Sequence, residues 1–354
     1  DQTPSLPFSY IQQVLADEFE GRNLNEIFSF IDEKPLGSAS IAQVHAARLV
    51  TGEDVVLKVQ KPGVETILYT DLNVVHWATK ILEKAVPKIK FASLSDIVDE
   101  IKTRMVREVD FIEEAQNLDD FIQYLNVSGN QAATAPKVYH QFSTRRVLTM
   151  QRLYGVSLTD FDVVKKYAKD PTQVLITAMN TWFGSLMLCK SFHADLHAGN
   201  LMLLEDGRIG FIDFGIVGQL NPEVWTACMA FMDALQHTNY TAMAENMLKM
   251  GMTHQKIDTQ VLADDLERLF SGVLLADPQE ILSSNPADLN DIMMDMIGVG
   301  ERHGIKFPRD FALLFKQMLY FDRFMRVLAP YTDIYADQRL KMVHNIEPAS
   351  FLKH

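Results

Sequence analysis

The chain has 354 residues, enough for one large domain or for two lobes that each bury a core of their own. Hydrophobic residues make up 47%, which is ordinary for a globular protein, and the formal net charge is -13 from 33 basic and 46 acidic side chains. Because a protein that mainly grips nucleic acid needs a basic face, this charge argues against nucleic acid as a partner.

Cysteine usage and hydropathy give two further limits. Cys189 and Cys228 support no disulfide framework and no paired metal motif, so we expect a reducing compartment and two buried thiols. The longest uncharged run, residues 173–189, is too short and too polar to predict a transmembrane segment. The chain starts at Asp1 without a signal-like segment, which indicates a mature or trimmed chain.

The first part of the chain is predicted to mix helices with strands. Apolar residues at helical spacing predict a helix from Phe8 that ends at Gly21, and a second short helix over residues 24–31. Runs rich in Val, Ile and Ala at residues 41–49 and 55–60 flank a hairpin tip at residues 51–54. Long helices over residues 64–85 and 94–125, a loop over 128–135, and short strands at 137–139 and 146–153 follow.

The second part is predicted to be mostly helical. Two short strands between residues 201 and 212 surround the turn Glu205-Asp206-Gly207. Helices continue from Pro222 to Met342, with breaks near residues 251, 278, 304 and 330. The expected fold class is therefore α+β: a small lobe of strands and helices over residues 1–153 precedes a larger helical lobe over residues 154–354.

One polar constellation carries the chemistry. Residues 193–200 read HADLHAGN, and Asp213-Phe214-Gly215 begins thirteen residues after Asn200. Protein kinases carry a loop Asp, an Asn five residues on, and an Asp-Phe-Gly after a strand pair. In this pattern Asp195 orients the attacking hydroxyl, while the oxygens of Asn200 and Asp213, brought close by the strand hairpin, hold Mg²⁺ against the nucleotide phosphates.

Two other interpretations of the constellation stay open. Asp and Gly favour turns, so the segments could be acidic turns without a function. His193, Asp195 and His197 could also form a transition-metal site of a phosphohydrolase, although that would leave Asn200 and Asp213 unused.

A strand lysine and a loop of small residues extend the pattern. Lys58 ends the run Val55-Val56-Leu57 on a predicted strand, where kinases place the lysine that pairs with phosphates. The loop Gly37-Ser38-Ala39-Ser40 lies upstream, and its small residues allow main-chain amides to approach phosphate. A solvated lysine at the end of a strand is the alternative.

Acidic residues on the second long helix are candidate partners for Lys58. Asp110 and Glu114 are four residues apart and would share a helix face, which is unfavourable unless a cation lies nearby. Lys58 or a bound metal would supply that cation, and Glu108 lies off this face. A solvated acidic face is the alternative.

Taken together, these segments resemble the UbiB family of atypical kinases, also known as the ADCK or ABC-one-like group. The matching segments follow the family's order from residue 35 to residue 219: PLGSASIAQVH (35–45), KVQKPGV (58–64), EVDFIEEAQN (108–117), HADLHAGN (193–200) and IDFG (212–215). The chain departs from the family in lacking its K-x-G-Q motif and in carrying Gly37 and Ser38 where many members have Ala.

The resemblance implies a kinase-like fold and roles for single residues. Gly37, Ser38, Ala39 and Ser40 correspond to the family's alanine-rich nucleotide loop, Lys58 to its strand lysine and Glu114 to the helix partner of that lysine. Glu108 and Asp110 correspond to the E-x-D motif near the nucleotide. Residues 149–153, with Gln151 and Leu153, correspond to the hinge beside adenine.

The resemblance also implies cofactors, partners and a compartment. Family members bind ATP or ADP with Mg²⁺ and support prenylquinone or isoprenoid-lipid metabolism, so we expect association with a lipid or a membrane surface and with proteins of a lipid-biosynthesis complex. The segment Val217-Gly218-Gln219-Leu220 is similar to plant and algal members, which favours a plastid before a mitochondrion. An aminoglycoside- or choline-kinase-like phosphotransferase and a nucleotide-binding pseudokinase scaffold stay open as alternative functions.

Overall fold

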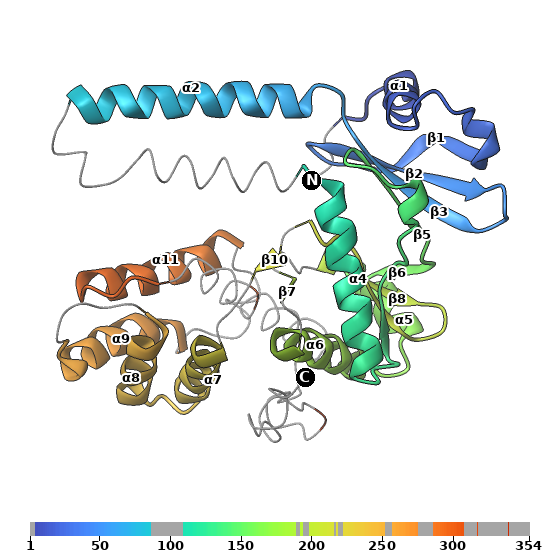
Figure 1. The fold of residues 1–354 in the computed structure, drawn as a ribbon. Helices are drawn as coiled ribbons and strands as arrows, with labels where there is room; N and C mark the ends of the chain where they lie inside the picture. Colours follow the sequence, from blue (N-terminus) through green and yellow to red (C-terminus); the bar gives the residue numbers. More distant parts are fainter. Residues whose placement is uncertain are drawn as a thin grey trace. The chain divides into compact units, whose positions relative to one another are not determined.

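The structure, a computed structural model, describes residues 4–85, 109–188, 192–193, 198–215, 217–218, 222–251, 257–274, 286–307, 317 and 339 (Figure 1). The chain forms two compact units: the first comprises Asp1–Gln123, Ala135–Tyr154 and Asp213–Ile216, and the second comprises Tyr124–Thr134, Gly155–Ile212 and Val217–His354. The predicted lobes, residues 1–153 and 154–354, stay a prediction, and the units differ from them in assigning Tyr124–Thr134 to the second unit and Asp213–Ile216 to the first.

The first unit contains a four-stranded antiparallel sheet. Its strand order is β1 (Phe28–Ser38), β2 (Ala42–Leu49), β3 (Asp54–Gln60) and β5 (Val147–Gln151). The unit also contains helix α1 (Phe8–Glu18), a 3-10 turn η1 (Leu24–Glu26), the long helix α2 (Val64–Ala85), the start of α4 (Phe111–Val127) and a second 3-10 turn η3 (His140–Phe142).

The side chains of strand β3 alternate between the two faces of the sheet. Val55, Leu57 and Val59 are fully buried and join the core that α1 forms with the sheet. The intervening side chains point to the opposite face because successive residues of a strand alternate. Lys58 and Gln60 lie on that opposite face, and both contact the α4 region.

Two helix predictions for this unit are wrong. Residues 24–31 form a 3-10 turn followed by the start of β1, not a helix. The predicted continuous helix over 94–125 is interrupted at Val109 and Asp110, which are not helical, and Phe111 begins α4; residues 94–108 lie outside the described part of the chain. Asp110 ends the loop as a cap, since its carboxylate accepts the main-chain N–H of Ile112 at 3.0 Å.

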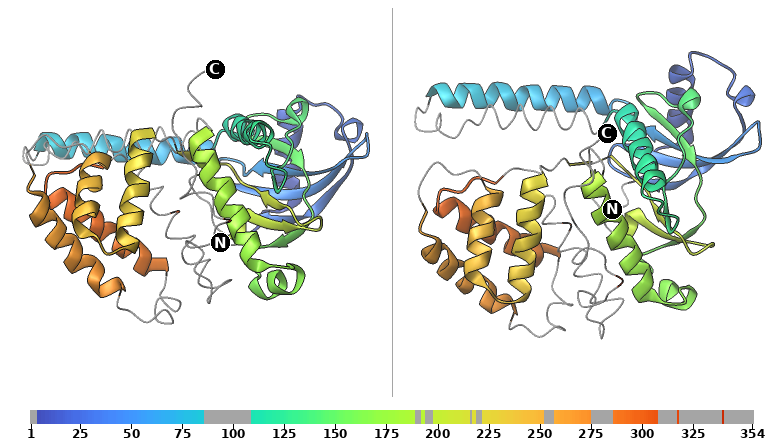
Figure 2. Two further views of the ribbon diagram at one scale, coloured as in Figure 1. Left: turned by 90° about the horizontal axis from the view of Figure 1, so that it is seen from below. Right: turned by 60° about the horizontal axis from the view of Figure 1, so that its bottom comes forward.

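The second unit combines a second sheet with a group of helices. Its sheet has the order β4 (Ala133–Thr134), β9 (Ile209–Phe211), β8 (Leu201–Leu204) and β6 (Gly155–Ser157), and β7 (Phe192–His193) pairs with β10 (Val217–Gly218). Its described helices are α5 (Phe161–Tyr167), α6 (Pro171–Leu188), α7 (Pro222–Gln236), α8 (Tyr240–Met250), α9 (Thr259–Leu274) and α11 (Pro286–Arg302), with a 3-10 turn η4 (Ala198–Asn200). Figure 2 shows α7, α8, α9 and α11 packed as one helical group.

The sequence predictions for this unit hold in part. The β8–β9 hairpin is confirmed, and Gly207 supplies the positive φ of 85° that its turn requires. The short strands β6, β7 and β10 were not predicted. The breaks near Gly251 and Gly304 are confirmed, whereas residues 278 and 330 lie outside the described residues.

The predicted burial of Cys228 is confirmed, because this thiol on α7 is fully buried; Cys189 lies outside the described part of the chain. Across the helices that the structure describes, none combines the length and the apolar character needed to cross a membrane.

Candidate active site

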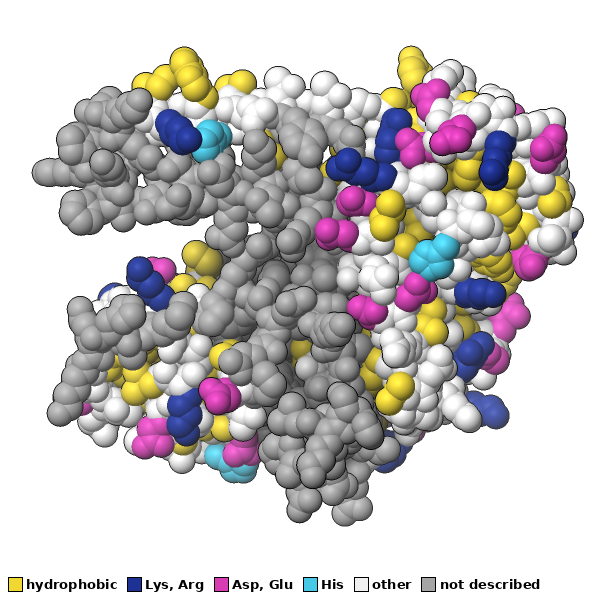
Figure 3. Space-filling view, in the orientation of Figure 1, with side chains coloured by type: hydrophobic (Ala, Val, Ile, Leu, Met, Phe, Trp, Pro, Cys, Tyr) yellow, Lys and Arg dark blue, Asp and Glu magenta, His cyan; other side chains and the backbone are white. Residues whose placement is uncertain are grey.

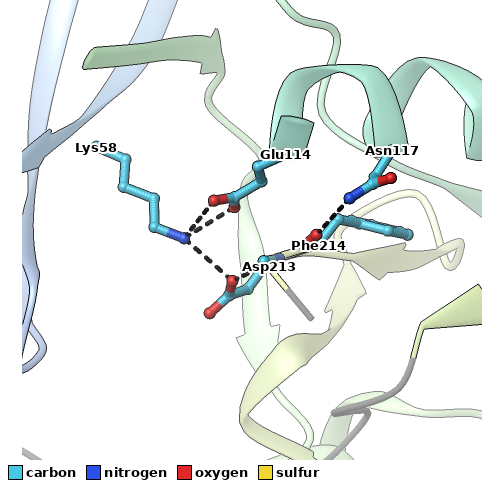
Figure 4. A network of polar contacts seen from close by, with 6 residues as sticks. Lys58, Glu114, Asn117, Asp213 and Phe214 are labelled. Carbon is cyan, nitrogen blue, oxygen red and sulfur yellow. Dashed lines mark hydrogen bonds and ion pairs between the residues drawn. The ribbon is translucent and has the colours of Figure 1, made fainter. Parts of the chain in front are cut away.

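Lys58 lies at the centre of a three-residue charge cluster in the first unit. Its Nζ lies 2.8 and 2.9 Å from the two carboxylate oxygens of Glu114 and 3.1 Å from Oδ1 of Asp213 (Figure 4). The predicted pairing of Lys58 with Glu114 is therefore present, and the solvated-lysine alternative is wrong. Lys58 and Glu114 are almost completely buried, whereas the Asp213 side chain is 51% exposed.

The electrostatics of the cluster follow from burial and charge. Burial alone would lower the pKa of Lys58, but the charges of Asp213 and Glu114 and their hydrogen bonds raise it well above the ordinary value. Burial raises the pKa of Glu114, and the Lys58 ammonium group opposes that rise only in part. Lys58 therefore stays positively charged at neutral pH, and it can bind a further anion besides the carboxylates of Glu114 and Asp213.

Neighbouring residues hold Lys58 and the start of α4 in place. The Lys58 ammonium group lies 5.4 Å from the centre of the buried Phe111 ring, a cation–π contact. The side chain of Gln60 donates to the main-chain oxygen of Val109 at 2.9 Å, and the N–H of Phe111 donates to the oxygen of Arg145 at 3.0 Å. Strand β3 thus fixes Val109 through Gln60 and the first turn of α4 through Lys58, two side chains of one face.

The Asp213-Phe214-Gly215 turn has an unusual backbone. Asp213 has a φ of 64°, a left-handed conformation that costs an L-residue about 1 kcal/mol and that Asp tolerates better than most residues. Phe214 is buried, and its ring packs on Phe121 with 4.9 Å between centroids. The turn therefore leaves the Asp213 carboxylate accessible to solvent, while the buried ring of Phe214 anchors the next residue.

The acidic residues upstream of Glu114 behave differently from the prediction. Asp110 precedes α4, so it does not share a helix face with Glu114, and its carboxylate lies 3.4 Å from Nε of Arg145. Asp110 thus pairs with Arg145, while Glu114 pairs with Lys58. Glu108 lies outside the described residues, and the nucleotide role of Glu108 and Asp110 stays a prediction.

The predicted nucleotide loop forms the β1–β2 turn. Gly37 and Ser38 end β1, Ala39 and Ser40 follow as an exposed turn, and the N–H of Ala39 donates to the oxygen of Ala42 at 2.9 Å. Gly37 has no positive φ and its missing Cβ faces open space. The loop is therefore small and open, as contact with phosphates would require.

Two buried polar residues behind this loop were missed by the sequence analysis. Gln43, fully buried on β2, accepts the N–H of Leu6 and donates to the Leu6 oxygen at 3.3 Å. His45, also fully buried, donates from Nδ1 to the oxygen of Asp32 at 2.8 Å, and burial lowers its pKa. Together with Ser38 and Lys61, which both donate to the oxygen of Pro4, these residues tie the N-terminal segment to the hairpin.

The predicted hinge residues lie at the end of the first unit. Gln151 ends β5, and its N–H donates to the oxygen of Lys137 at 2.8 Å. Leu153 lies between β5 and β6, and the preceding Arg152 donates its N–H to the oxygen of Asp54. Their adenine-binding role stays a prediction.

The remaining predicted residues belong to the second unit. Asn200 ends η4, is buried, and its main-chain oxygen accepts the N–H of Ile212 at 2.9 Å. Its predicted proximity to Asp213 stays a prediction, and Asp195 and His197 lie outside the described residues. Within the described part of the chain no three His, Cys, Asp or Glu side chains gather as a metal cluster.

The donor set at Asp213 fits a hard cation. Mg²⁺ keeps several waters and takes one or two carboxylates plus substrate phosphates, so a half-exposed carboxylate suits it. A site of this kind needs no dense cluster of side chains. Asp213 is therefore a fitting ligand for Mg²⁺ that arrives with a nucleotide.

Comparison with known proteins is consistent with this geometry. The ABC1 atypical kinase-like domain matches residues 1–247. The chloroplastic aarF domain-containing protein kinase At5g05200 of Arabidopsis thaliana is 44% identical over 98% of this chain and 67% of that protein. A probable protein kinase UbiB of Azotobacter vinelandii is 28% identical over 95% of this chain and 62% of that protein.

A further plant relative and a solved structure agree. The chloroplastic protein ACTIVITY OF BC1 COMPLEX KINASE 1 of Arabidopsis thaliana is 29% identical over 90% of this chain and 46% of that protein. The structure of Rv3197 with erythromycin from Mycobacterium tuberculosis superimposes with a TM-score of 0.64 and 24% identity, covering 92% of this chain and 79% of that one, and it supports the predicted kinase-like α+β fold. The chain belongs to the ABC1 atypical kinase-like family, the UbiB and ADCK group.

Proposed function

We propose that the chain binds ATP or ADP with Mg²⁺ and acts as an ATPase or phosphotransferase that supports prenylquinone or isoprenoid-lipid metabolism in a plastid. The single observation that carries the phosphate chemistry is Lys58, buried and held by Glu114 with its ammonium group 3.1 Å from Asp213. A cation fixed beside an accessible carboxylate is the arrangement that phosphoryl transfer uses to bind nucleotide phosphates and their metal.

Each residue has a proposed task. Bound Mg-ATP would supply the phosphoryl group. Lys58 binds phosphate oxygens, Asn200 and Asp213 hold the metal, and Asp195 orients the hydroxyl or water that attacks. The exposed turn approaches the phosphates with the main-chain amide of Ser40, because the amide of Ala39 bonds the oxygen of Ala42.

The first experiment measures thermal stabilisation by Mg²⁺ with ATP or ADP. We expect Asp213→Asn to lose the part of the stabilisation that depends on Mg²⁺, because it removes the carboxylate from the metal. Asp206→Asn is a matched control, since this turn aspartate is equally exposed and bonds only Arg208 in the described contacts. Full stabilisation of Asp213→Asn by Mg-ATP would contradict the assignment.

The second experiment separates an enzyme from a binding scaffold. Phosphate release from ATP is measured for the wild-type protein and for Asp195→Asn, which we expect to bind nucleotide normally but to turn it over at least about a hundredfold more slowly. Nucleotide binding without turnover in the wild-type protein, even with isoprenoid lipid present, would favour the pseudokinase scaffold.

The lipid pathway and compartment rest on the relatives. Two of the Arabidopsis relatives are named chloroplastic, and UbiB kinases are among the other matches. A fluorescent fusion of the full-length protein would report the organelle, with a mitochondrion as the other outcome. Lipids that co-purify with the full-length protein would identify the pathway.

A further inference from the structure

Helix α4 places two side chains against the main chain of Phe214. Glu114 and Asn117 are three residues apart and therefore share a helix face. Nδ2 of Asn117 donates to the main-chain oxygen of Phe214 at 3.1 Å, and the main chain of Phe214 lies close enough to the Glu114 carboxylate to lower its pKa. Figure 4 shows Asn117 pointing at the carbonyl group, and all of these residues belong to the first unit.

The hydrogen bond from Asn117 fixes the peptide group that follows Phe214. This peptide group joins Phe214 to Gly215 and is held through its oxygen. The N–H of Gly215 lies 3.4 Å from Oδ1 of Asp213 and closes the turn. The peptide group between Phe214 and Gly215 cannot rotate without breaking its bond to α4.

The held turn matters most for Asp213. Its left-handed φ of 64° is less favourable than an ordinary conformation, so it persists only where neighbouring bonds maintain it. The direction of the Asp213 carboxylate follows from this φ and from the ion pair with Lys58. Helix α4 thus positions two residues of the charge cluster: it positions Lys58 through Glu114, and it positions Asp213 through the main chain of Phe214.

We propose that Asn117 is a positioning residue that keeps the Asp213-Phe214-Gly215 turn in the conformation that presents the Asp213 carboxylate to Mg²⁺. The metal part of this inference rests on the proposed function. An amide suits the position because it donates to a carbonyl oxygen and adds no charge beside the two carboxylates. Aspartate would keep the shape but would direct lone pairs and a third negative charge at that oxygen.

The first test needs no nucleotide. Hydrogen exchange of the Phe214 and Gly215 amides is measured in the ligand-free wild-type protein and in Asn117→Leu. Gln116→Leu is the matched control, since this neighbouring exposed amide on α4 contacts Asp120 at 2.9 Å. We expect exchange about five- to tenfold faster in Asn117→Leu, as the loss of one hydrogen bond predicts, and unchanged exchange in the control. Unchanged exchange in Asn117→Leu would overturn the inference.

The second test uses ADP as the probe, with and without Mg²⁺. We expect Asn117→Leu to reduce the gain in ADP affinity from Mg²⁺ about five- to tenfold while the affinity without metal stays the same. A purely structural role would change both affinities equally or neither, and either result would overturn the positioning role. Asn117→Asp should behave in the same way and replaces the leucine variant if that one fails to fold.

The two tests separate this inference from the proposed function. A wild-type protein that bound no ADP under any condition would overturn the proposed function and the Mg²⁺ role with it. The exchange experiment would then still decide whether Asn117 holds the turn.

Discussion

At the scale of single residues, one buried cation serves two carboxylates. Lys58 is 14% exposed and Glu114 3%, so neither charge is well solvated, whereas Asp213 reaches water. A buried charge that loses its partner cannot be compensated by solvent and typically destabilises the fold by about 3–5 kcal/mol. Glu114 therefore depends on Lys58 for its ionised form.

Replacing Lys58 should make stability depend on pH in a specific direction. In Lys58→Met the pKa of Glu114, already raised by burial, rises further because its cation is gone. At a pH between the pKa of Glu114 in the unfolded state and its pKa in the folded state, only the folded state holds the proton. The stability of the variant therefore falls as pH rises through this range. Relative to the wild-type protein, we expect Lys58→Met to lower the free energy of unfolding by about 3 kcal/mol at pH about 8. At pH about 5 this loss should be smaller by at least about 1 kcal/mol, and urea unfolding would measure both values.

A double variant provides the control for this prediction. Lys58→Met with Glu114→Gln has no carboxyl group to titrate at that position, so the additional dependence on pH should disappear. If the destabilisation of Lys58→Met were the same at both pH values, Glu114 would not be the responsible group.

The thiol of Cys228 should be unreactive in the folded protein. Burial raises the pKa of Cys228 to about 12, so its thiolate fraction at pH about 8 is about a thousandfold below that of an ordinary cysteine. In a Cys189→Ser background, iodoacetamide should label the native protein at least about a thousandfold more slowly than the urea-unfolded protein. Similar rates would show that α7 opens readily around Cys228.

The sequence predicted single residues where residue type and spacing are specific. The strand lysine and the helix glutamate were paired correctly, because the resemblance to the kinase family assigns Glu114 as the helix partner of Lys58. Asn117 and Gln43 were missed, since their partners are main-chain atoms of Phe214 and Leu6. A bond to a backbone group imposes no residue type on its partner, so no pattern in the sequence reveals it.

At the scale of elements, short apolar segments were the least predictable. Leu24, Ile27, Phe28 and Ile31 have helical spacing, yet the residues after Ile27 extend as β1. Pairing with β2 decides the outcome, because six of the eleven residues of β1 gain partners on β2. Longer segments such as α2 kept their helical period and were predicted to the residue.

Two glycines of α11 give a matched test of helix packing. A Cβ at Gly298 would have only an Arg302 nitrogen at 3.8 Å, whereas a Cβ at Gly300 would overlap the Phe307 ring. We expect Gly298→Ala to raise the free energy of unfolding by about 0.5–1 kcal/mol, since alanine is the better helix former.

Gly300→Ala should lower the free energy of unfolding by about 1–3 kcal/mol, because Phe307 and Met247 would have to move. Thermal and urea unfolding of both variants would check the two values. Equal effects of the two substitutions would mean that α11 does not pack on Phe307 as described.

At the scale of the whole molecule, the chain does not divide at one point in the sequence. Asp213–Ile216 joins the first unit although the residues on either side belong to the second, and Tyr124–Thr134 does the reverse. Composition and turn signals indicate boundaries along the chain, but they do not reveal that a short segment belongs to a different unit from its neighbours in sequence. The predicted boundary after residue 153 was therefore the most that sequence could indicate.

Net charge leads to a prediction about the proposed membrane partner. The chain carries -13 at pH 7, and on the face drawn in Figure 3 the lysines and arginines of the described residues are interspersed with acidic side chains. Anionic bilayers attract clustered basic residues by about 1 kcal/mol each and repel a net negative protein. Charge should therefore oppose binding to an anionic surface, and any affinity for lipid should come from apolar contacts.

A flotation assay with two kinds of vesicle tests this prediction. Replacing about a third of the zwitterionic lipid by anionic lipid should leave the bound fraction of protein unchanged or lower it, most clearly at about 0.01 M salt, where the Debye length is about 30 Å. Raising the salt to about 0.15 M should reduce that difference, because screening weakens repulsion. If anionic lipid instead increased binding and salt abolished the increase, a local basic surface would outweigh the net charge, and membrane association would be electrostatic.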